Sequence, residues 1–285
     1  IINDIMGKNG TFVTPVAPVS KTNRLYSGNS FYTSMFRTDA AAFWMGNLKK
    51  FGYSRTGQVL DRSGTPVEDL LDGGAKPSSC WGTGINDWLE VDKGGAGRQV
   101  KDQAVRNFYT YYNDDTSPNP TSLTSAANAF SVGNDLLTDE VFHIDGVSQT
   151  REDLISYVRA DGDYAGSRTW VLGDIMHSRP AVMRDGNKNY IYVGANDGFL
   201  HCFEDNEQAT YENLNDDVIT EKWCFIPWAL LSKLTLMKTT STHQYFVDGS
   251  PVLYSLDGYK YLTFGLRRGG SNYYTLKVGS LQNGE

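Results

Sequence analysis

Residues 173–204 read GDIMHSRPAVMRDGNKNYIYVGANDGFLHCFE, and this stretch decides the predicted fold. Its apolar and aromatic residues fall into three short runs, which span residues 178–183, 189–195 and 199–203. Asp-Gly pairs at 185–186 and 197–198 separate these runs. Because Asp-Gly suits the tight turn of a hairpin, with a type I′ turn expected at 197–198, the runs predict antiparallel strands. A fourth run at 222–228, KWCFIPW, completes a predicted four-stranded antiparallel sheet.

The same layout returns in residues 250–276, SPVLYSLDGYKYLTFGLRRGGSNYYTL. The interval from Pro180 to Gly194 equals the interval from Pro251 to Gly265, so each Pro and each Gly has an equivalent in the other unit. Four-stranded sheets that recur, and that cannot bury both faces alone, predict a β-propeller. A Greek-key sandwich is the alternative, and it explains the strands but not the repeated layout.

The repeat is longer than the ~40–45 residues of a plain propeller blade. An acidic loop at 204–221 and a predicted helix at 229–238 account for the excess. We therefore predict an all-β fold, a partial and modified β-propeller of four-stranded antiparallel blades with loop and short-helix insertions. Residues 1–285 are expected to form a single domain of this kind. Its opening blades and insertions would span 25–172, and 173–285 would form two regular units, the last without its outer strand.

The first half of the chain has weaker patterns than the second. Thr150 and Asp153 have the spacing of a capping box, which predicts a helix over 150–160. The remaining expectations are a hairpin at 31–53, loops with little regular structure at 61–100, a strand at 105–113 and a short helix at 122–132.

Composition excludes some classes of function. The chain has a net charge of −7 and a pI of about 5.2, so it lacks the basic stripe that nucleic-acid phosphates require. No apolar run approaches the roughly 20 residues that span a bilayer. The chain begins at Ile1, so we expect a fragment of a longer protein, and the compartment stays open.

Asp174, His177 and Ser178 offer the residue types of a hydrolytic triad. A triad requires convergence in space, whereas neighbours on a strand point to opposite faces. The GxSxG motif of a nucleophile elbow is also absent from the sequence. We therefore expect structural hydrogen bonds from these residues and no catalytic role.

Metal-binding signatures are weak. The chain has no CxxC, CxxCH or HExxH, and His201 sits inside a predicted strand, where a hydrogen-bonded core histidine is the more common role than a ligand. Residues 204–217 contain six carboxylates but no DxDxDG run, so a solvated loop is favoured over a calcium site. Arg267 and Arg268 are expected to be an exposed pair or to contact an acidic neighbour, and Asp197 is explained by its turn.

Cys202 and Cys224 lie on consecutive predicted strands. If they face each other, Phe203 stacks on Trp223 and the two Cα atoms come within disulfide range. An oxidising compartment would preserve such a bond. Two alternatives stay open at this point, namely a disulfide and two buried thiols. Cys80 would be free or paired outside the fragment.

Five runs of the sequence, in order, resemble the C-terminal domain of the PilC/PilY family, the type IV pilus-tip adhesins. They are GDIMHSRP, YVGANDGFLHCF, KWCFIPW, YFVDGSP and GGSNYYTL. Upstream runs such as LYSGNSFYTSMF and FWMGNLKKFGY are also similar to that family, so the resemblance covers about residues 25–285. We assign a structural role to the motif residues Gly173, Asp174, His177, Ser178, Pro180, Gly194, Asp197, Gly198, His201, Trp223, Asp248, Gly249, Pro251, Gly269 and Gly270.

The resemblance implies a modified β-propeller related to that of the quinoprotein dehydrogenases. It implies a place at the pilus tip or outer membrane, with minor pilins and a host or abiotic surface as partners. It also implies roles in pilus assembly, twitching motility and surface attachment. Calcium in many members is bound by a later DxDxDG loop, which this fragment lacks, and the fragment has no RGD tripeptide. A quinoprotein dehydrogenase is the alternative function, although the chain has no adjacent cysteine pair to lie under a quinone.

Overall fold

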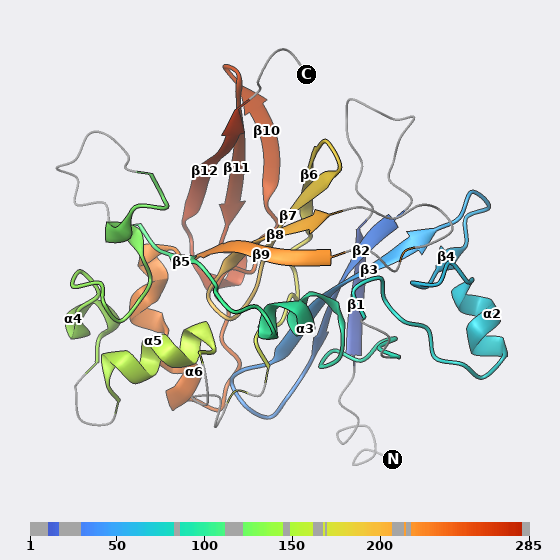
Figure 1. The fold of residues 1–285 in the computed structure, drawn as a ribbon. Helices are drawn as coiled ribbons and strands as arrows, with labels where there is room; N and C mark the ends of the chain where they lie inside the picture. The colour runs from blue at the N-terminus through green and yellow to red at the C-terminus, as the bar shows by residue number, and fades with distance from the viewer. Residues whose placement is uncertain are drawn as a thin grey trace.

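The computed structural model describes residues 30–82, 86–111, 122–144, 149–161, 168, 170–206, 214 and 218–280, together with the backbone of 11–16. Most of its regular structure is β, and the strands form three sheets (Figure 1). The all-β expectation is confirmed at this level. The closed ring of a β-propeller stays a prediction. The greater part of the acidic loop, 207–213 and 215–217, lies outside the described residues.

The first sheet has the order β1-β2-β3-β4 and is antiparallel. Its strands are β1 (Thr11–Val16), β2 (Ser30–Arg37), β3 (Met45–Tyr53) and β4 (Val59–Leu60). The hairpin predicted at 31–53 is confirmed, because β2 pairs with β3 along its whole length. Two adjacent lysines of β3 are fully buried, and each has a carboxylate partner: Lys49 lies 3.1 Å from Asp87, and Lys50 lies 2.8 Å from Asp205.

The central sheet has the order β5-β9-β8-β7-β6. Its strands are β5 (Phe108–Tyr109), β6 (Ala181–Asp185), β7 (Lys188–Gly194), β8 (Leu200–Asn206) and β9 (Val218–Phe225). Strands β6 to β9 form the antiparallel four-stranded unit that the sequence predicts. The short strand β5 was predicted as a strand, but its parallel pairing with β9 was not.

The turn between β7 and β8 differs from the predicted type I′ turn. Strand β7 ends at Gly194 and β8 begins at Leu200, so the connection is longer than two residues. Gly198 has a φ of +106°, whereas Asp197 is not among the residues with positive φ. A type I′ turn requires positive φ at both central residues, so that prediction is wrong.

The third sheet consists of β10 (Val252–Leu256), β11 (Tyr259–Gly265) and β12 (Tyr273–Ser280), in that order and antiparallel. It has three strands, which agrees with the predicted unit that lacks its outer strand. The β10–β11 turn places Asp257 and Gly258 at φ values of +49° and +77°. This turn therefore has the left-handed conformations that favour Asp-Gly.

Short helices connect the sheets. They are α2 (Val67–Asp72), α3 (Gly95–Lys101), α4 (Asp139–Phe142), α5 (Arg151–Arg159), α6 (Leu236–Thr239) and the 3₁₀ turns η1 (Ala126–Asn128), η3 (Trp228–Lys233) and η4 (Arg267–Gly269). The predicted cap of α5 is confirmed, since Thr150 Oγ1 accepts a hydrogen bond of 3.2 Å from the Asp153 amide. The loops expected at 61–100 are interrupted by α2 and α3, and the described residues between these two helices belong to no helix or strand.

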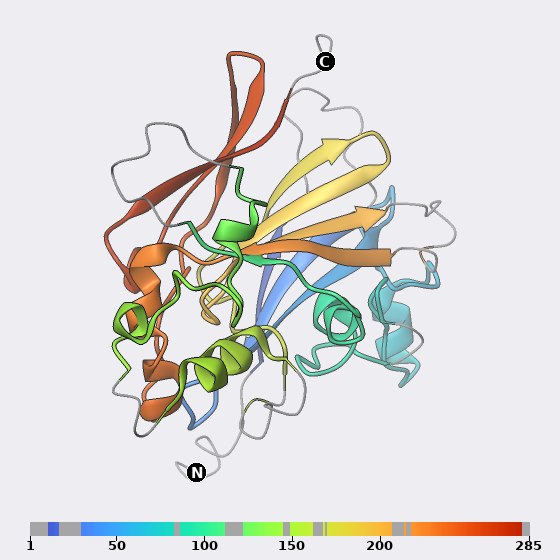
Figure 2. The same cartoon turned by 60° about the vertical axis from the view of Figure 1, so that its left-hand side comes forward.

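Two apolar cores separate the sheets into layers. Ile191, Val193 and Phe203 of the central sheet pack in one core with Tyr32 and Leu48 of the first sheet. The other face of the central sheet contributes Tyr192 and Cys202 to a second core. This core also holds Leu262 and Phe264 of the third sheet and residues of α5. Side chains alternate along a strand, so the central sheet is buried on both faces. Figures 1 and 2 show it between the first sheet (blue) and the third sheet (red).

Candidate functional site

The segments that lead into β6 and β10 are joined by two reciprocal His–Asp contacts. His177 Nδ1 lies 2.8 Å from an Asp248 oxygen, and His243 Nε2 lies 2.7 Å from Asp174 Oδ1. Asn196 links the two pairs, since its Nδ2 donates to Asp174 over 2.7 Å and approaches Asp248 at 3.5 Å. We call these five residues the inter-sheet node. It connects the central sheet to the third sheet, and His177 and Asp248 occupy equivalent positions in the alignment that matches Pro180 with Pro251.

Ser178 takes part in a backbone contact beside this node. It is buried, and its Oγ accepts a hydrogen bond of 2.9 Å from the Gly194 amide. In the next unit, Ser250 Oγ accepts from the Arg179 amide over 3.0 Å. Each hydroxyl therefore satisfies a backbone donor and holds two segments together. Asp174, His177 and Ser178 do not converge as a triad, because His177 contacts Asp248 and Asp174 contacts His243.

Several motif glycines are positions of close backbone approach. A Cβ at Gly173 would collide with the Asp197 backbone, and a Cβ at Gly249 would collide with the Gly265 carbonyl. Gly194 and Gly269 lie in the same way against Val247 and Phe246.

The other motif residues have packing or backbone roles. Pro180 and Pro251 are buried just before strands β6 and β10. The Trp223 and Tyr192 rings pack with their centroids 5.9 Å apart. Gly270 has a φ of 169°, which is ordinary extended backbone.

Arg267 and Arg268 lie close to the inter-sheet node. Arg267 approaches Asp248 at 3.5 Å, and Arg268 donates to the Tyr245 hydroxyl over 3.0 Å. The expectation of an exposed pair or a contact to an acidic neighbour therefore agrees with the structure.

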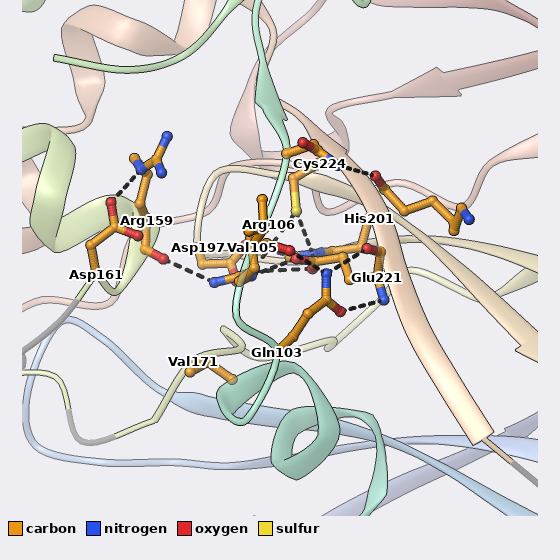
Figure 3. Close-up of polar contacts among 12 residues, drawn as sticks. Gln103, Val105, Arg106, Arg159, Asp161, Val171, Asp197, His201, Glu221 and Cys224 are labelled. Carbon is orange, nitrogen blue, oxygen red and sulfur yellow. Dashed lines mark hydrogen bonds and ion pairs between the residues drawn. The ribbon is translucent and has the colours of Figure 1, made fainter. Parts of the chain in front are cut away.

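A second polar cluster is buried in the central sheet beneath β5 (Figure 3). His201 Nε2 lies 3.1 Å from Asp197 Oδ1, and its Nδ1 lies 2.8 Å from Glu221 Oε1. Arg106 donates hydrogen bonds to the Glu221 carboxylate from Nε and Nη2, and Nη2 also lies 3.8 Å from Cys224 Sγ. These side chains are almost fully buried, so the cluster is a charged network inside an otherwise apolar region.

The network sets the protonation of its members. Burial by itself would raise the pKa of Glu221, but the charges of Arg106 and His201 bring it well below the usual carboxyl range. Burial likewise disfavours the charged form of His201, but Asp197 raises its pKa well above the ordinary value. Burial raises the pKa of the Cys224 thiol to about 12. His201 is therefore an imidazolium between two carboxylates, and Cys224 is a neutral thiol.

His201, Glu221 and Cys224 are close enough to ligate one metal ion. Their chemistry does not fit that role. A metal requires a neutral imidazole and a thiolate. Here both ring nitrogens of His201 contact carboxylates, and the Glu221 carboxylate already accepts a hydrogen bond from the Arg106 guanidinium. The cluster is a charge-paired hydrogen-bond network.

A cavity of about 450 Å³ adjoins this network. We call it the arginine cavity, because its lining includes Arg106, Arg159 and Arg168, together with Lys101, Asp161 and Trp170. Arg168 is buried and donates to the carbonyls of Val158 and Val171 over 2.6 Å. The cavity therefore combines buried cationic groups with apolar walls.

Of the two alternatives left open for Cys202 and Cys224, the strand register supports two buried thiols and excludes the disulfide. Cys224 lies opposite His201, and Cys202 lies opposite Trp223. The predicted register was wrong by one residue, and a β-bulge between Cys202 and Phe203 shifts the pairing further along the strands. Adjacent strand residues point to opposite faces, so the two thiols point away from each other. Both cysteines are free and buried, and Cys80 is buried as well.

The sequence did not identify Arg106, Arg168, Glu221, Asn196 and His243 as members of these clusters. Glu221 offered one signal, because it is a carboxylate inside the strand run of β9, where an unpaired charge is costly. Arg106 lies at the start of the strand predicted at 105–113 and Arg168 in a stretch without a predicted element, and only the folded chain brings them to the same place.

The fold and the two clusters define a mostly β chain of stacked antiparallel sheets that are held together by buried polar networks. In the described part of the chain, no helix is both long and apolar enough to cross a membrane. No protein-family model matches the sequence, and no solved structure matches it either.

Among curated proteins, the chain is similar to type IV pilus biogenesis factors named PilY1. It is 32% identical to that of Pseudomonas aeruginosa UCBPP-PA14 over 130 residues, which cover 35% of this chain and 10% of the relative. It is 28% identical to that of strain PAO1 over 165 residues, which cover 45% of this chain and 13% of the relative. A PilY1 homolog of Xylella fastidiosa is 28% identical over 179 residues, or 47% of this chain and 11% of the relative. The chain is therefore similar to PilY1 proteins over less than half of its own length, and the matches span only about a tenth of these relatives.

Proposed function

We propose that this chain is part of a type IV pilus biogenesis factor that acts at the cell surface, at the tip of the pilus. The supporting observation is the set of matches to PilY1 proteins, all of which carry the name of type IV pilus biogenesis factor. In this proposal the chain contacts minor pilins, supports pilus assembly and twitching motility, and promotes attachment to a host or abiotic surface. It is a structural and binding module and not an enzyme.

We further propose that the three sheets are neighbouring blades of a β-propeller. In the alignment that matches Pro180 with Pro251, Leu262 and Phe264 are the equivalents of Ile191 and Val193, and they face the preceding sheet in the same way. Tyr192 of the central sheet faces the next sheet, and its equivalent in this alignment is Thr263. The third sheet thus repeats the packing direction of the central sheet.

The outer face of the third sheet is the place where this stacking would continue. On it Val252 is 60% exposed, Leu256 54% and Tyr254 41%. Tyr254 stacks on Tyr261 with ring centroids 5.6 Å apart. In the proposal a further sheet covers this face with an apolar surface like that of Leu262 and Phe264. No cofactor is assigned to this segment, and calcium is assigned to other parts of the longer protein.

The test is a deletion of residues 173–280 from the gene in its source organism. We expect loss of surface pili and of twitching, with recovery when the intact segment is restored. Labelled antibody against the segment should mark pilus ends, and minor pilins should co-purify with the protein from sheared pili. Normal pili, twitching and attachment in the deletion strain would contradict the proposal. Dye-linked alcohol oxidation by the purified protein with added quinone and calcium would favour the dehydrogenase instead.

A further inference from the structure

The buried network beside the arginine cavity has an excess of positive charge. Its cations are Arg106, Arg168 and His201. The two arginines are always charged, and His201 is protonated because both of its ring nitrogens face carboxylates, which only accept hydrogen bonds. Asp197 and Glu221 are its anions. Three cations against two carboxylates leave one positive charge among the described residues of this network. A buried charge without a partner is costly, so this imbalance points to an anion.

Arg168 is the cation of the network whose charge is least compensated by nearby carboxylates. Its guanidinium donates mainly to backbone carbonyls, namely those of Tyr157, Val158, Trp170 and Val171. These dipoles solvate a cation, but they carry no net charge. Its carboxylate neighbour is Asp197 at 3.5 Å, and Asp197 also accepts from the Gly173 amide over 2.8 Å and contacts His201. The Asp197 carboxylate is thus shared by two buried cations, Arg168 and His201.

The open space lies on the cationic side of this network. Arg106 and Arg168 both line the arginine cavity, and Arg159 and Lys101 add two further positive charges to its wall. Among the described residues of the lining, Asp161 is the one carboxylate, and it contacts Arg159 Nε (Figure 3). Arg159 also donates through Nη1 to the Phe130 carbonyl over 2.9 Å, which fixes the guanidinium at the cavity.

We propose that the arginine cavity binds a small organic anion, in which a carboxylate or phosphate group is joined to an apolar body. The donors of Arg168 are engaged by backbone carbonyls, so the anionic group would lie against Arg159 and Lys101 and would compensate the charge of Arg168 across the cavity that all three line. The apolar body would contact Val105, Val171 and Trp170, which also line the cavity. A volume of about 450 Å³ lies in the range of small-molecule sites, and guanidinium groups suit both anions. This proposal does not depend on the proposed contacts with pilins.

The experiment is isothermal titration calorimetry of the purified chain with benzoate, phenyl phosphate and benzyl alcohol. Benzyl alcohol presents the same ring without a charge, so we expect heat from the two anions and none from the alcohol. The affinity should fall as salt is raised, because part of the cavity wall is open to solvent. Equal binding of the alcohol, or no heat with either anion at millimolar concentration, would overturn the proposal.

Three variants test whether the anion binds in this cavity. Arg159→Gln should weaken it about tenfold or more, because a charge-assisted hydrogen bond is lost. Asp161→Asn should strengthen it about threefold, because a competing carboxylate is removed. Lys76→Gln changes the charge by the same amount as Arg159→Gln at an exposed position outside the cavity lining, and it should have no effect. Tighter binding cannot result from misfolding, so an Asp161→Asn variant that binds no more tightly contradicts the proposal even if Arg159→Gln fails to fold.

Discussion

Ser178 shows how one hydroxyl stabilises the junction of two segments. Its Oγ accepts from the Gly194 amide, and the residue is 2% exposed. The Ser178→Ala variant leaves that buried amide without a partner, so we expect the free energy of unfolding to fall by about 1–3 kcal/mol. Pilus function should stay near normal where the protein still folds. Urea melts and a twitching assay measure the two effects, and loss of twitching in a folded variant would contradict the structural role.

The three cysteines lead to a prediction about reactivity. All three are buried, no disulfide joins Cys202 to Cys224, and burial raises the pKa of these two thiols. The thiolate is the reactive form, so alkylation of the native protein should be slow. In denaturant without reductant, three thiols per chain should react. Mass spectrometry decides the matter, since a peptide that links residues 202 and 224 would show that the strand register described above is wrong.

At the scale of elements, β8 and β9 owe part of their stability to the charged network between them. The pKa of Glu221 is lowered, so its contribution is present above its unfolded pKa of about 4.3 and is lost as the pH falls through the folded value. The pKa of His201 is raised, so its contribution is present below about 6.5 and is lost as the pH rises through the folded value. The network should therefore be strongest between these two limits.

The His201→Gln variant tests this dependence. Just above pH 6.5 the wild-type protein should lose up to roughly 1.4 kcal/mol of unfolding free energy per pH unit from this residue alone. The variant lacks that loss, so the difference in stability between the two proteins should shrink from pH 6 to pH 8. Urea melts at both pH values measure it. A constant difference would mean that folding leaves the pKa of His201 unchanged, and a difference that grows with pH would mean that His201 is neutral in the folded chain. His143→Gln is the matched control, because that residue is exposed and outside the network.

The same elements show how far the sequence predicts the fold. Alternating apolar residues and Asp-Gly pairs identified β6 to β8 and β10 to β12, because those signals are local. The register of β8 on β9 was wrong by one residue, since it depends on a bulge that no local pattern encodes. The charged network was also missed, because Arg106 and Glu221 are far apart in the chain and meet only after the parallel pairing of β5 with β9.

At the scale of the whole molecule, substitutions on the outer face of the third sheet can test whether the sheets belong to a propeller. Val252 and Leu256 are more than half exposed in this chain, so Val252→Thr and Leu256→Thr should each change the unfolding free energy by less than about 0.5 kcal/mol. In a longer PilY1-like polypeptide that supplies a further sheet, both side chains would be buried. Each substitution should then cost about 1–2 kcal/mol, because apolar area that packs against the new sheet becomes polar.

The control for this comparison is Leu262→Thr. Leu262 faces the central sheet and has no exposed area, so its replacement should destabilise the short and the long polypeptide alike. Thr is a good strand former, so strand propensity does not explain a difference between the sites. Urea melts of all variants in both lengths give the comparison. If Val252→Thr and Leu256→Thr remain neutral in the longer polypeptide while Leu262→Thr does not, no sheet covers this face and the stacking ends at β10 to β12.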